Sequence, residues 1–319
     1  MRAVTITGVD QIVAGSVPDP TPGPDEVLVR VEASAVCRTD LQILRGDLPA
    51  HRLPVIPGHQ VVGTDVATGQ RVGLVWLAQT CGTCRFCRSG RENLCDHARF
   101  TGWDRDGGYA ELVTAHRDFV HPLPPGDPAA MAPLLCGGVI GFRSLRVAGL
   151  GPHSAGTRLG LFGFGASATV AIQVARFWGC QCYVVTRSQV EVRRALELGA
   201  VWAGTYDQAM PQRLDAAVTF APSGDVVVSA LRALDKGGIV AINAIHLDRI
   251  PQLNYDDLWW ERSLRSVANV TRADVRDFLA VVPAAGVTTQ FEVVPLAAAP
   301  MALDRVESGD VRGAFVLQG

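Results

Sequence analysis

The feature that most restricts the fold of this chain is a glycine-containing loop between a short apolar stretch and a helical stretch. Residues 159–162 have the pattern of a buried strand, and residues 166–178 form a helical stretch of small and apolar side chains. Between them lies the sequence Gly163-Phe164-Gly165-Ala166-Ser167-Ala168, which fits G-x-G-x-x-G/A. In this pattern the first glycine allows a tight turn, the second lets the backbone approach a pyrophosphate, and the small last residue allows close helix–strand packing. We therefore expect a dinucleotide-binding loop here, with an unliganded glycine-rich turn as the alternative.

Strand-like and helical stretches continue to alternate after this loop. Further strands are expected at 183–185, from Val201, at 215–220 and at 239–243, and helices at 189–198, with Gly199 as its C-terminal cap, and at 225–234. Such alternation predicts an α/β fold with a parallel, doubly wound sheet. We place this nucleotide-binding domain at residues 138–267.

The remaining parts of the chain point to a second domain. In the first third, Val27, Val29 and Val31 alternate with Leu28, Arg30 and Glu32, and residues 71–78 also read as a strand. A total of 319 residues fits about two domains. We therefore expect a mainly-β domain at residues 1–137. The tail 268–319 contains a helix, a strand at 291–294, a helix at 298–307 and a strand at 313–317, and we expect it to return to the N-terminal part.

Charge and hydrophobicity exclude several classes of partner. The net charge of −2 gives no broad basic surface for nucleic acid or an anionic membrane. No apolar run of about 18 residues predicts a transmembrane helix, and the N-terminus lacks the apolar region of a secretory signal. A cytoplasmic protein with a small-molecule partner is the resulting expectation.

The end of the second strand of the nucleotide-binding domain predicts which cofactor is preferred. NAD sites usually place a carboxylate there to bind the ribose 2′-hydroxyl. This strand instead ends in Thr186-Arg187-Ser188. Arg187 can pair with a 2′-phosphate, and the two hydroxyls can donate hydrogen bonds to it. The sequence therefore favours NADP(H) over NAD(H), although an Arg187 that stacks on the adenine would tolerate either cofactor.

Four of the eight cysteines lie within fifteen residues, with the spacing C-x2-C-x2-C-x7-C. The four are Cys81, Cys84, Cys87 and Cys95. Four thiolates can surround a zinc ion tetrahedrally and leave no position for water, which is the pattern of a structural site. An iron–sulfur centre is a rival, but the fourth cysteine is at the wrong distance and no proline follows it. Disulfides are disfavoured in a chain without an export signal.

Three further potential metal ligands are widely separated in the sequence. Cys37 lies in Cys37-Arg38-Thr39-Asp40, His59 follows Gly58, and Cys136 precedes Gly137-Gly138. Each taken alone is more often a packed core residue than a ligand. Together they form the Cys2His set of a catalytic zinc that keeps one open position.

These motifs and the glycine loop, in this order, resemble the zinc-dependent alcohol dehydrogenases of the medium-chain dehydrogenase/reductase superfamily. The resemblance covers essentially the whole chain and is closest to a bacterial subgroup with the loop Gly-Phe-Gly-Ala-Ser-Ala. It implies a GroES-like catalytic domain split around a Rossmann domain, with the active site in the cleft. It also implies two zinc ions per chain and a homodimer or homotetramer.

The resemblance assigns roles to individual residues. Cys37, His59 and Cys136 match the catalytic zinc ligands, and Thr39 matches the hydroxyl that hydrogen-bonds the zinc-bound alkoxide. Trp76 matches a tryptophan of the substrate pocket, and Trp103 adds to the aromatic side chains available for its walls. Asp40 matches a carboxylate that steadies the zinc neighbourhood, and Arg312 matches an arginine near the pyrophosphate; both are alternatively plain surface charges.

Two positions depart from the family pattern. Gln60 stands where a glutamate often follows the Gly-His motif, and we expect it to slow zinc–ligand exchange. Gln42 stands where many relatives end their proton relay with a histidine. An amide does not titrate near neutral pH, so either the proton leaves by another route, such as through water, or the chemistry is insensitive to pH in that range.

The reaction implied by the resemblance is reversible hydride transfer between an alcohol and a nicotinamide cofactor. One alternative is a reductase of the same superfamily that acts on an activated C=C bond or on a bulky carbonyl or iminium group. The C=C reductases lack the Cys2His set. Another alternative is a cofactor-binding regulatory protein without catalysis. The remaining cysteines, Cys180 and Cys182, are expected to be packed side chains without chemistry.

Overall fold

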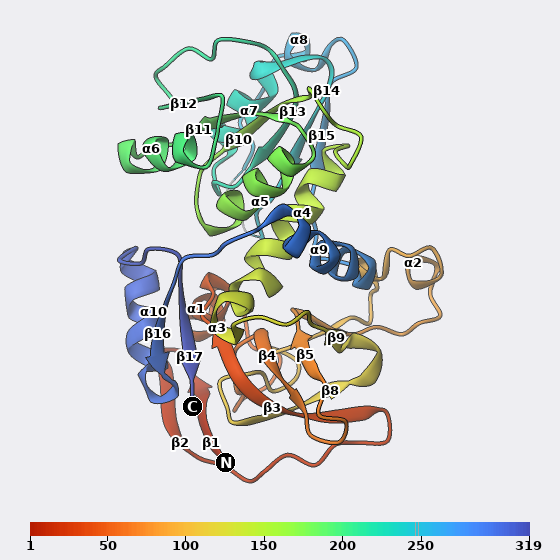
Figure 1. Ribbon diagram of the computed structural model, residues 1–319, viewed down its shortest axis with the longest axis vertical. Helices are drawn as coiled ribbons and strands as arrows, with labels where there is room; N and C mark the ends of the chain where they lie inside the picture. The colour runs from red at the N-terminus through yellow and green to blue at the C-terminus, as the bar shows by residue number, and fades with distance from the viewer. Residues whose placement is uncertain (246, 248) are drawn as a thin grey trace. The chain divides into compact units, whose positions relative to one another are not determined.

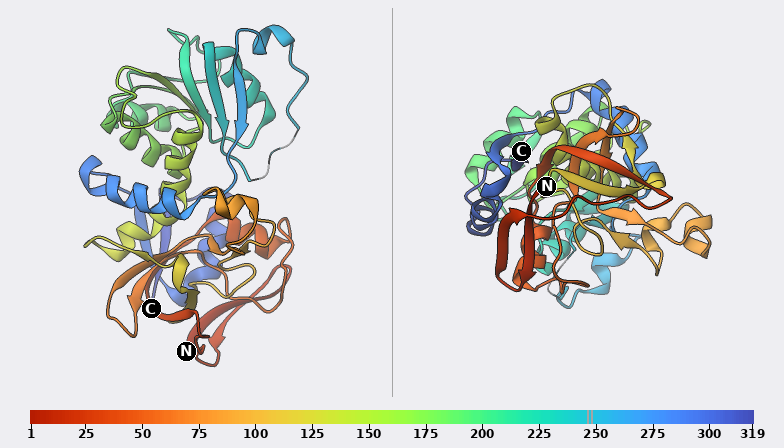
Figure 2. Two further views of the ribbon diagram at one scale, coloured as in Figure 1. Left: turned by 90° about the vertical axis from the view of Figure 1, so that its right-hand side faces the viewer. Right: turned by 90° about the horizontal axis from the view of Figure 1, so that it is seen from below.

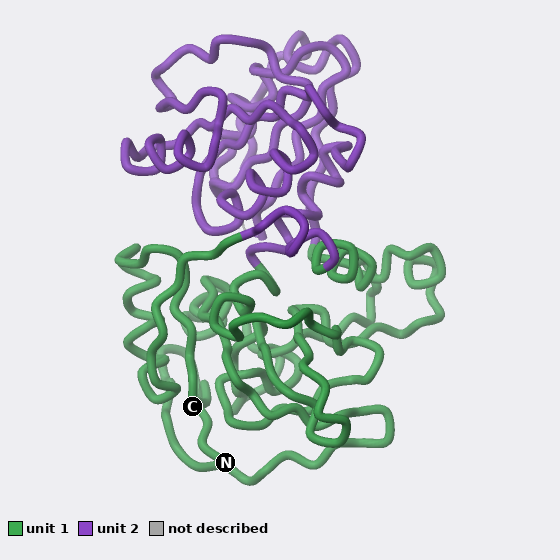
Figure 3. The backbone as a smooth tube through the Cα atoms, viewed as in Figure 1, with its two compact units in different colours: residues 1–136, 269–279, 288–319 green, residues 137–268, 280–287 purple. Residues whose placement is uncertain are grey.

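In the computed structural model, which describes residues 1–245, 247 and 249–319, the chain divides into two units (Figure 3). Unit 1 consists of Met1–Cys136, Asn269–Leu279 and Thr288–Gly319, and unit 2 of Gly137–Ala268 and Ala280–Val287. The N-terminal and C-terminal segments thus belong to the same unit.

Unit 2 is built on a parallel sheet with the strand order β12-β11-β10-β13-β14-β15 (Figure 1). Its strands are β10 (Arg158–Phe162), β11 (Gln181–Val185), β12 (Trp202–Gly204), β13 (Leu214–Thr219), β14 (Leu234–Ile242) and β15 (Ser263–Ser266). Its helices are α4 (Gly137–Val147), α5 (Ala166–Phe177), α6 (Gln189–Glu197), α7 (Gly224–Ala233) and α8 (Tyr255–Leu258). This sheet confirms the predicted doubly wound α/β fold.

The strand order of this sheet reverses between β10 and β13. Since parallel crossovers are right-handed, a reversal places the connecting helices on opposite faces of the sheet. Figure 2 shows α5 and α7 on opposite faces in this way. Such a reversal leaves an opening at the carboxyl ends of the strands, which is where open α/β sheets bind their ligands.

Unit 1 contains a seven-stranded sheet and two small two-stranded sheets. The large sheet runs β16-β17-β3-β4-β5-β9, with β8 also paired to β3. Its strands are β3 (Glu26–Ala35), β4 (Gln60–Asp65), β5 (Arg71–Leu74), β8 (Leu112–His116), β9 (His121–Pro122), β16 (Phe291–Pro295) and β17 (Ala314–Gln318). The small sheets pair β1 (Arg2–Gly8) with β2 (Gln11–Ser16), and β6 (Leu77–Gln79) with β7 (Arg99–Phe100).

Short helices connect these strands. They are α1 (Arg38–Arg45), α2 (Arg85–Arg88), α3 (Pro128–Met131) and α10 (Ala299–Ser308), with 3-10 turns at Glu92–Leu94, Arg117–Phe119, Ala132–Leu135 and Leu296–Ala298. Helix α9 (Arg272–Ala285) begins in unit 1 and ends in unit 2. The last strand, β17, pairs antiparallel with β3, so a C-terminal strand completes a sheet of N-terminal strands.

Two details of the strand patterns are informative. In β3, Val29 is fully buried and Arg30 is exposed, as the alternation in the sequence predicts. The strand predicted over residues 71–78 is wrong as a single strand, because it divides into β5 and β6, which belong to different sheets. At the break, Thr101 bonds both neighbouring carbonyls: its hydroxyl donates to Val75 O at 2.8 Å and its N–H to Trp76 O at 2.9 Å.

No single helix in the described ranges is long and apolar enough to cross a membrane. Only the pair Pro128–Leu135 and Gly137–Val147, bent by 41°, reaches that length and composition together.

His121, in β9, is a buried histidine whose Nε2 atom has no hydrogen-bond partner. Burial, with a smaller effect of the positive charge of Arg272, lowers the pKa of His121 to about 4. Unfolding restores an ordinary pKa of about 6.5, so the unfolded chain binds a proton over a range in which the folded chain does not.

We expect His121 to make unit 1 less stable as the pH falls from about 6.5 toward 4. Between pH 8 and pH 5 the loss from this residue is about 2 kcal/mol of unfolding free energy. Urea unfolding of the wild type and of His121→Leu at both pH values measures it. The pH-dependent part should be smaller in the variant, and equal pH dependence in the two proteins contradicts the assignment.

Candidate functional site

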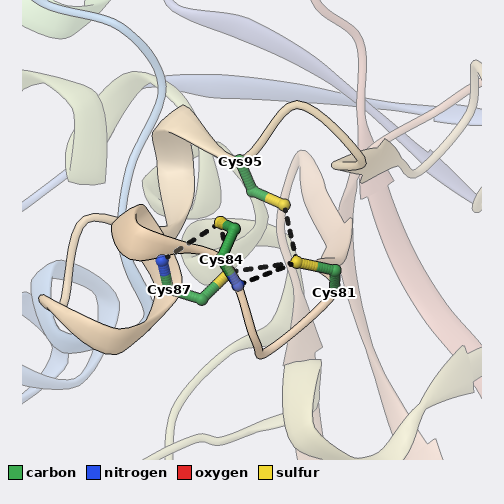
Figure 4. Close-up of side chains that lie close together, drawn as sticks. All are labelled: Cys81, Cys84, Cys87 and Cys95. Carbon is green, nitrogen blue, oxygen red and sulfur yellow. Dashed lines mark hydrogen bonds between the residues drawn. The ribbon is translucent and has the colours of Figure 1, made fainter.

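The four clustered cysteines converge on one point in unit 1 (Figure 4). Their sulfur atoms all lie within 4.8 Å of one another, with Cys81–Cys87 at 3.9 Å, Cys84–Cys87 at 3.5 Å and Cys95–Cys81 at 3.6 Å. These separations exceed the roughly 2.0 Å of a disulfide bond. Four sulfurs bound tetrahedrally at about 2.3 Å from one ion stand about 3.8 Å apart. The spacing therefore fits a single zinc-sized ion.

Backbone N–H groups around these thiols favour negative charge on sulfur. Cys84 N donates to Cys81 Sγ at 3.4 Å, and Cys87 N donates to Cys84 Sγ at 3.5 Å. Hydrogen bonds from Thr83 and Cys84 lower the pKa of Cys81 to about 6. Burial has the opposite effect on Cys95 and raises its pKa to about 11. At the start of the short helix α2, backbone amides therefore point toward the sulfur atoms of Cys81 and Cys84.

The three separated ligands also come together in unit 1. Cys37 precedes α1, His59 precedes β4, and Cys136 follows the 3-10 turn Ala132–Leu135. Their donor atoms lie within 4.8 Å of one another, and His59 is buried. The set offers three ligands, which leaves the fourth position of a tetrahedron for another molecule.

The carboxylate of Asp40 organises this cluster. It is fully buried and receives four hydrogen bonds, two on each oxygen. On Oδ1 they come from His59 Nδ1 at 3.0 Å and Gly58 N at 3.2 Å, and on Oδ2 from Cys37 N at 2.9 Å and the Tyr109 hydroxyl at 3.0 Å. Because Asp40 engages Nδ1 of His59, Nε2 is the ring nitrogen left to bind a metal.

Tyr109 was not recognised from the sequence, although it lies in Gly107-Gly108-Tyr109. Its ring is fully buried against Gly58, where an added Cβ would stand 2.3 Å from the ring. Gly58 also has a φ of +94°, so both its backbone and the adjacent ring require glycine. The glycine before His59 in the sequence indicates that a bulky group packs against the backbone there. The sequence alone does not identify that group as the ring of Tyr109.

The side chains of this cluster shift one another's pKa values. Burial opposes a positive charge on His59, but Asp40 and Cys37 outweigh it and raise the pKa of His59 to about 10. A hydrogen bond with Cys136, together with His59, lowers the pKa of the Cys37 thiol well below its usual range. The same bond and burial raise the pKa of Cys136 well above its usual range. Cys136 and His59 therefore stabilise the thiolate of Cys37 without a metal ion.

Aromatic rings lie beside His59. Trp76 meets it edge to face, with the ring centroids 4.9 Å apart, and stacks on Phe100 at 5.2 Å and on Trp103 at 5.8 Å. His51 stacks on Trp103 at 3.9 Å. Thr39, on α1, is buried, and its hydroxyl oxygen lies 3.7 Å from Cys37 Sγ. The ligand set therefore has a hydroxyl and an aromatic wall of Trp76, Phe100 and Trp103 as neighbours.

The glycine loop of unit 2 makes a tight turn between β10 and α5. Gly163 has a φ of +90°, and an added Cβ would stand 3.0 Å from Ala221 N. Gly165 caps α5, and an added Cβ there would meet no atom within 4 Å. Ala168 is fully buried against the sheet, whereas Ala166 is exposed and Ser167 half-buried. The loop thus presents the N-terminus of a twelve-residue helix with open space in front of it.

The residues expected to choose the cofactor follow β11. Arg187 is exposed, Ser188 caps α6, and Thr186 is buried with its hydroxyl donating to the carboxylate of Glu191. Glu191 lies on α6, outside the strand end Thr186-Arg187-Ser188, which contains no acidic residue. Its carboxylate nevertheless lies beside that strand end, because it accepts from Thr186.

The remaining predicted residues have simple environments. Arg312 is exposed in unit 1 just before β17. Gln60 is buried, and its amide donates to Ala35 O at 3.3 Å. Gln42 is half-buried in α1. Cys180 and Cys182 are buried free thiols, and burial raises their pKa values to about 11 and 12.

Comparison with known proteins identifies relatives of the whole chain. The family described as alcohol dehydrogenase GroES-like domain matches residues 23–125. The chain is 48% identical over 314 residues to the probable alcohol dehydrogenase AdhA of Mycobacterium tuberculosis, covering 93% of this chain and 90% of that protein. It is 31% identical over 312 residues to an alcohol dehydrogenase of Geobacillus stearothermophilus, covering 92% and 91%. The structure of a cinnamyl alcohol dehydrogenase of Sorghum bicolor has the same fold, with a TM-score of 0.90 at 24% identity over 99% of this chain and 97% of that one.

Tyr109→Phe tests the hydrogen-bond arrangement around Asp40. The substitution keeps the ring against Gly58 but removes one donor from a buried carboxylate. Hydrogen bonds to charged groups contribute about 1.5–3 kcal/mol, and we expect a loss of unfolding free energy in this range. Urea unfolding measures it, and a loss below about 0.5 kcal/mol contradicts a structural role for the hydroxyl.

Proposed function

Because this chain belongs to the alcohol dehydrogenases of the medium-chain dehydrogenase/reductase superfamily, we propose that it is a zinc-dependent enzyme that interconverts alcohols and aldehydes or ketones with NADP(H). The observation that carries this proposal is the convergence of Cys37, His59 and Cys136 from three distant segments. The intact Cys2His set argues against the zinc-free reductases of activated C=C bonds.

The residues present fit a catalytic zinc. Two sulfurs and one imidazole nitrogen are suited to zinc, and three protein ligands leave one position for substrate. The Asp40 carboxylate fixes the orientation of His59 and increases its basicity as a ligand. A zinc ion held there supplies Lewis acidity, which favours ionisation of an alcohol. The four-cysteine cluster fits a second, closed site that contributes to folding and not to chemistry.

The side chains of unit 1 act on the substrate. The Thr39 hydroxyl accepts the proton that the alcohol gives up and passes it on toward the cofactor ribose. Gln42 cannot accept that proton by titration, so the relay ends in water. The aromatic wall of Trp76, Phe100 and Trp103 binds the carbon part of the substrate and excludes solvent from it.

The side chains of unit 2 bind the cofactor. The amides at the start of α5 receive the pyrophosphate, and Gly165 permits its close approach. Arg187 and Ser188 bind the 2′-phosphate, which accounts for a preference for NADP(H). A bound nicotinamide supplies the hydride acceptor or donor at C4.

Two further proposals rest on the family resemblance. Arg312, a residue of unit 1, binds near the pyrophosphate, and the protein forms a homodimer or homotetramer.

Metal analysis tests the two-zinc proposal. We expect two zinc ions per chain in the wild type and one in Cys37→Ser, because a serine hydroxyl is a poor zinc ligand while the four-cysteine site is untouched. Turnover in the variant should fall at least about a hundredfold. Cys180→Ser is the matched control, since Cys180 is buried away from both clusters, and it should keep both ions. A wild type with one zinc rules out the catalytic site.

Oxidation of NADPH and NADH over a graded panel of aldehydes and ketones tests the reaction and the cofactor. We expect a higher kcat/KM with NADPH. Arg187→Ala should lower it with NADPH roughly tenfold to a hundredfold, because a charged hydrogen bond contributes about 1.5–3 kcal/mol, and change it little with NADH. The control for net charge is Arg193→Ala, because Arg193 is also exposed but lies on α6, away from the end of β11. A higher kcat/KM with NADH in the wild type overturns the cofactor assignment.

A further inference from the structure

The edge of unit 2 that would receive the adenosine ribose is defined by two neighbouring strands. Gly163 N donates to Val185 O at 2.7 Å, so the carboxyl end of β11 lies directly beside the glycine loop. Thr186 N donates to Gly204 O at 3.0 Å, which brings the end of β12 to the same edge. A ribose whose pyrophosphate lies on the loop therefore contacts the residues that follow Val185. This step rests on the proposed cofactor site.

Glu191 places a carboxylate at this edge. As the third residue of α6 it donates its N–H to Ser188 Oγ at 3.4 Å, which is ordinary capping at a helix start. In a capping box its carboxylate would return to the backbone N–H of Ser188. Here it accepts instead from the hydroxyl of Thr186, which is buried at the end of β11. The Thr186 hydroxyl is thereby engaged, and a negative charge is held next to the strand end.

The surrounding groups show that Arg187 and Glu191 act on the same region with opposite sign. Burial raises the pKa of Tyr206, just after β12; Arg187 lowers that pKa and Glu191 raises it. Burial lowers the pKa of Arg194, on the next turn of α6, and Glu191 opposes that shift. The edge thus combines one exposed arginine with one fixed carboxylate.

We propose that Glu191 is a specificity-determining residue that opposes recognition of the 2′-phosphate by Arg187. A 2′-phosphate carries close to two negative charges, and a carboxylate nearby repels it, whereas a 2′-hydroxyl can donate to that carboxylate. The wild-type protein therefore separates NADP(H) from NAD(H) less strongly than Arg187 alone would. Removing the charge of Glu191 should sharpen the preference for the phosphorylated cofactor.

Two small ligands that differ only in the 2′-phosphate isolate this effect from catalysis. Calorimetric titration with 2′,5′-ADP and with 5′-AMP compares the wild type with Glu191→Gln, which keeps an oxygen acceptor for Thr186. Like charges near a protein surface repel each other and solvent screens part of that repulsion, so we expect Glu191→Gln to bind 2′,5′-ADP roughly tenfold more tightly than the wild type does. Binding of 5′-AMP should not become tighter, because its 2′-hydroxyl is not repelled by the carboxylate. The gain should shrink at high salt, because the repulsion is screened.

Glu197→Gln is the matched control. Glu197 lies on the same helix, is exposed and, like Glu191, raises the pKa of Arg194. Its substitution therefore makes the same change in net charge without removing the partner of Thr186. It should leave the ratio of the two affinities unchanged. An unchanged ratio in Glu191→Gln, or an equal gain in Glu197→Gln, overturns the role of Glu191 while the cofactor site stands. If neither ligand binds the wild type, both the cofactor site and this proposal are wrong.

Discussion

The buried carboxylate of Asp40 is the interaction on which the candidate metal site depends. A charge removed from water must be fully hydrogen-bonded to be tolerated, and Asp40 is satisfied only when three separate segments meet around it. These are the start of α1, the segment of Gly58 and His59, and the bend at Tyr109. The same convergence brings Cys37 and His59 together, so the requirement that satisfies Asp40 also assembles two of the three ligands.

In unit 2, backbone groups rather than a buried side chain form the candidate binding site. The reversal of strand order at β10 and β13 opens the carboxyl edge of the sheet, and the glycine loop places unpaired amides of α5 at that edge. In the cofactor site that we propose, opposite charges lie at this edge. Arg187 lies in the strand-end tripeptide, whereas Glu191 reaches the same place from the first turn of α6. Selectivity in this arrangement is a difference between attraction and repulsion.

Much of the fold followed from local patterns. The alternation of strands and helices after residue 158 predicted the parallel sheet, because its periodicity and its glycine loop are properties of short segments. The strand predicted over residues 71–78 failed because its division depends on Thr101, a residue more than twenty positions away. Local patterns do not predict the roles of Tyr109 and Glu191 for a similar reason. The partner of Tyr109, Asp40, is far away in the sequence and comes close only after folding, and the partner of Glu191, Thr186, lies outside its helix.

The sequence by itself determined the residue types available for chemistry: four cysteines with metal-ligand spacing, two cysteines and a histidine of ligand type that are widely separated, and a loop that matches a dinucleotide-binding pattern. Spacing within a short segment is fixed by covalent geometry, so the four-cysteine turn could be recognised directly. Only the tertiary structure decided that Cys37, His59 and Cys136 meet, that Asp40 bonds Cys37 and His59 while accepting from Tyr109, and that Glu191 faces Thr186. These contacts join distant segments or separate elements, and packing, rather than local propensity, brings such groups together.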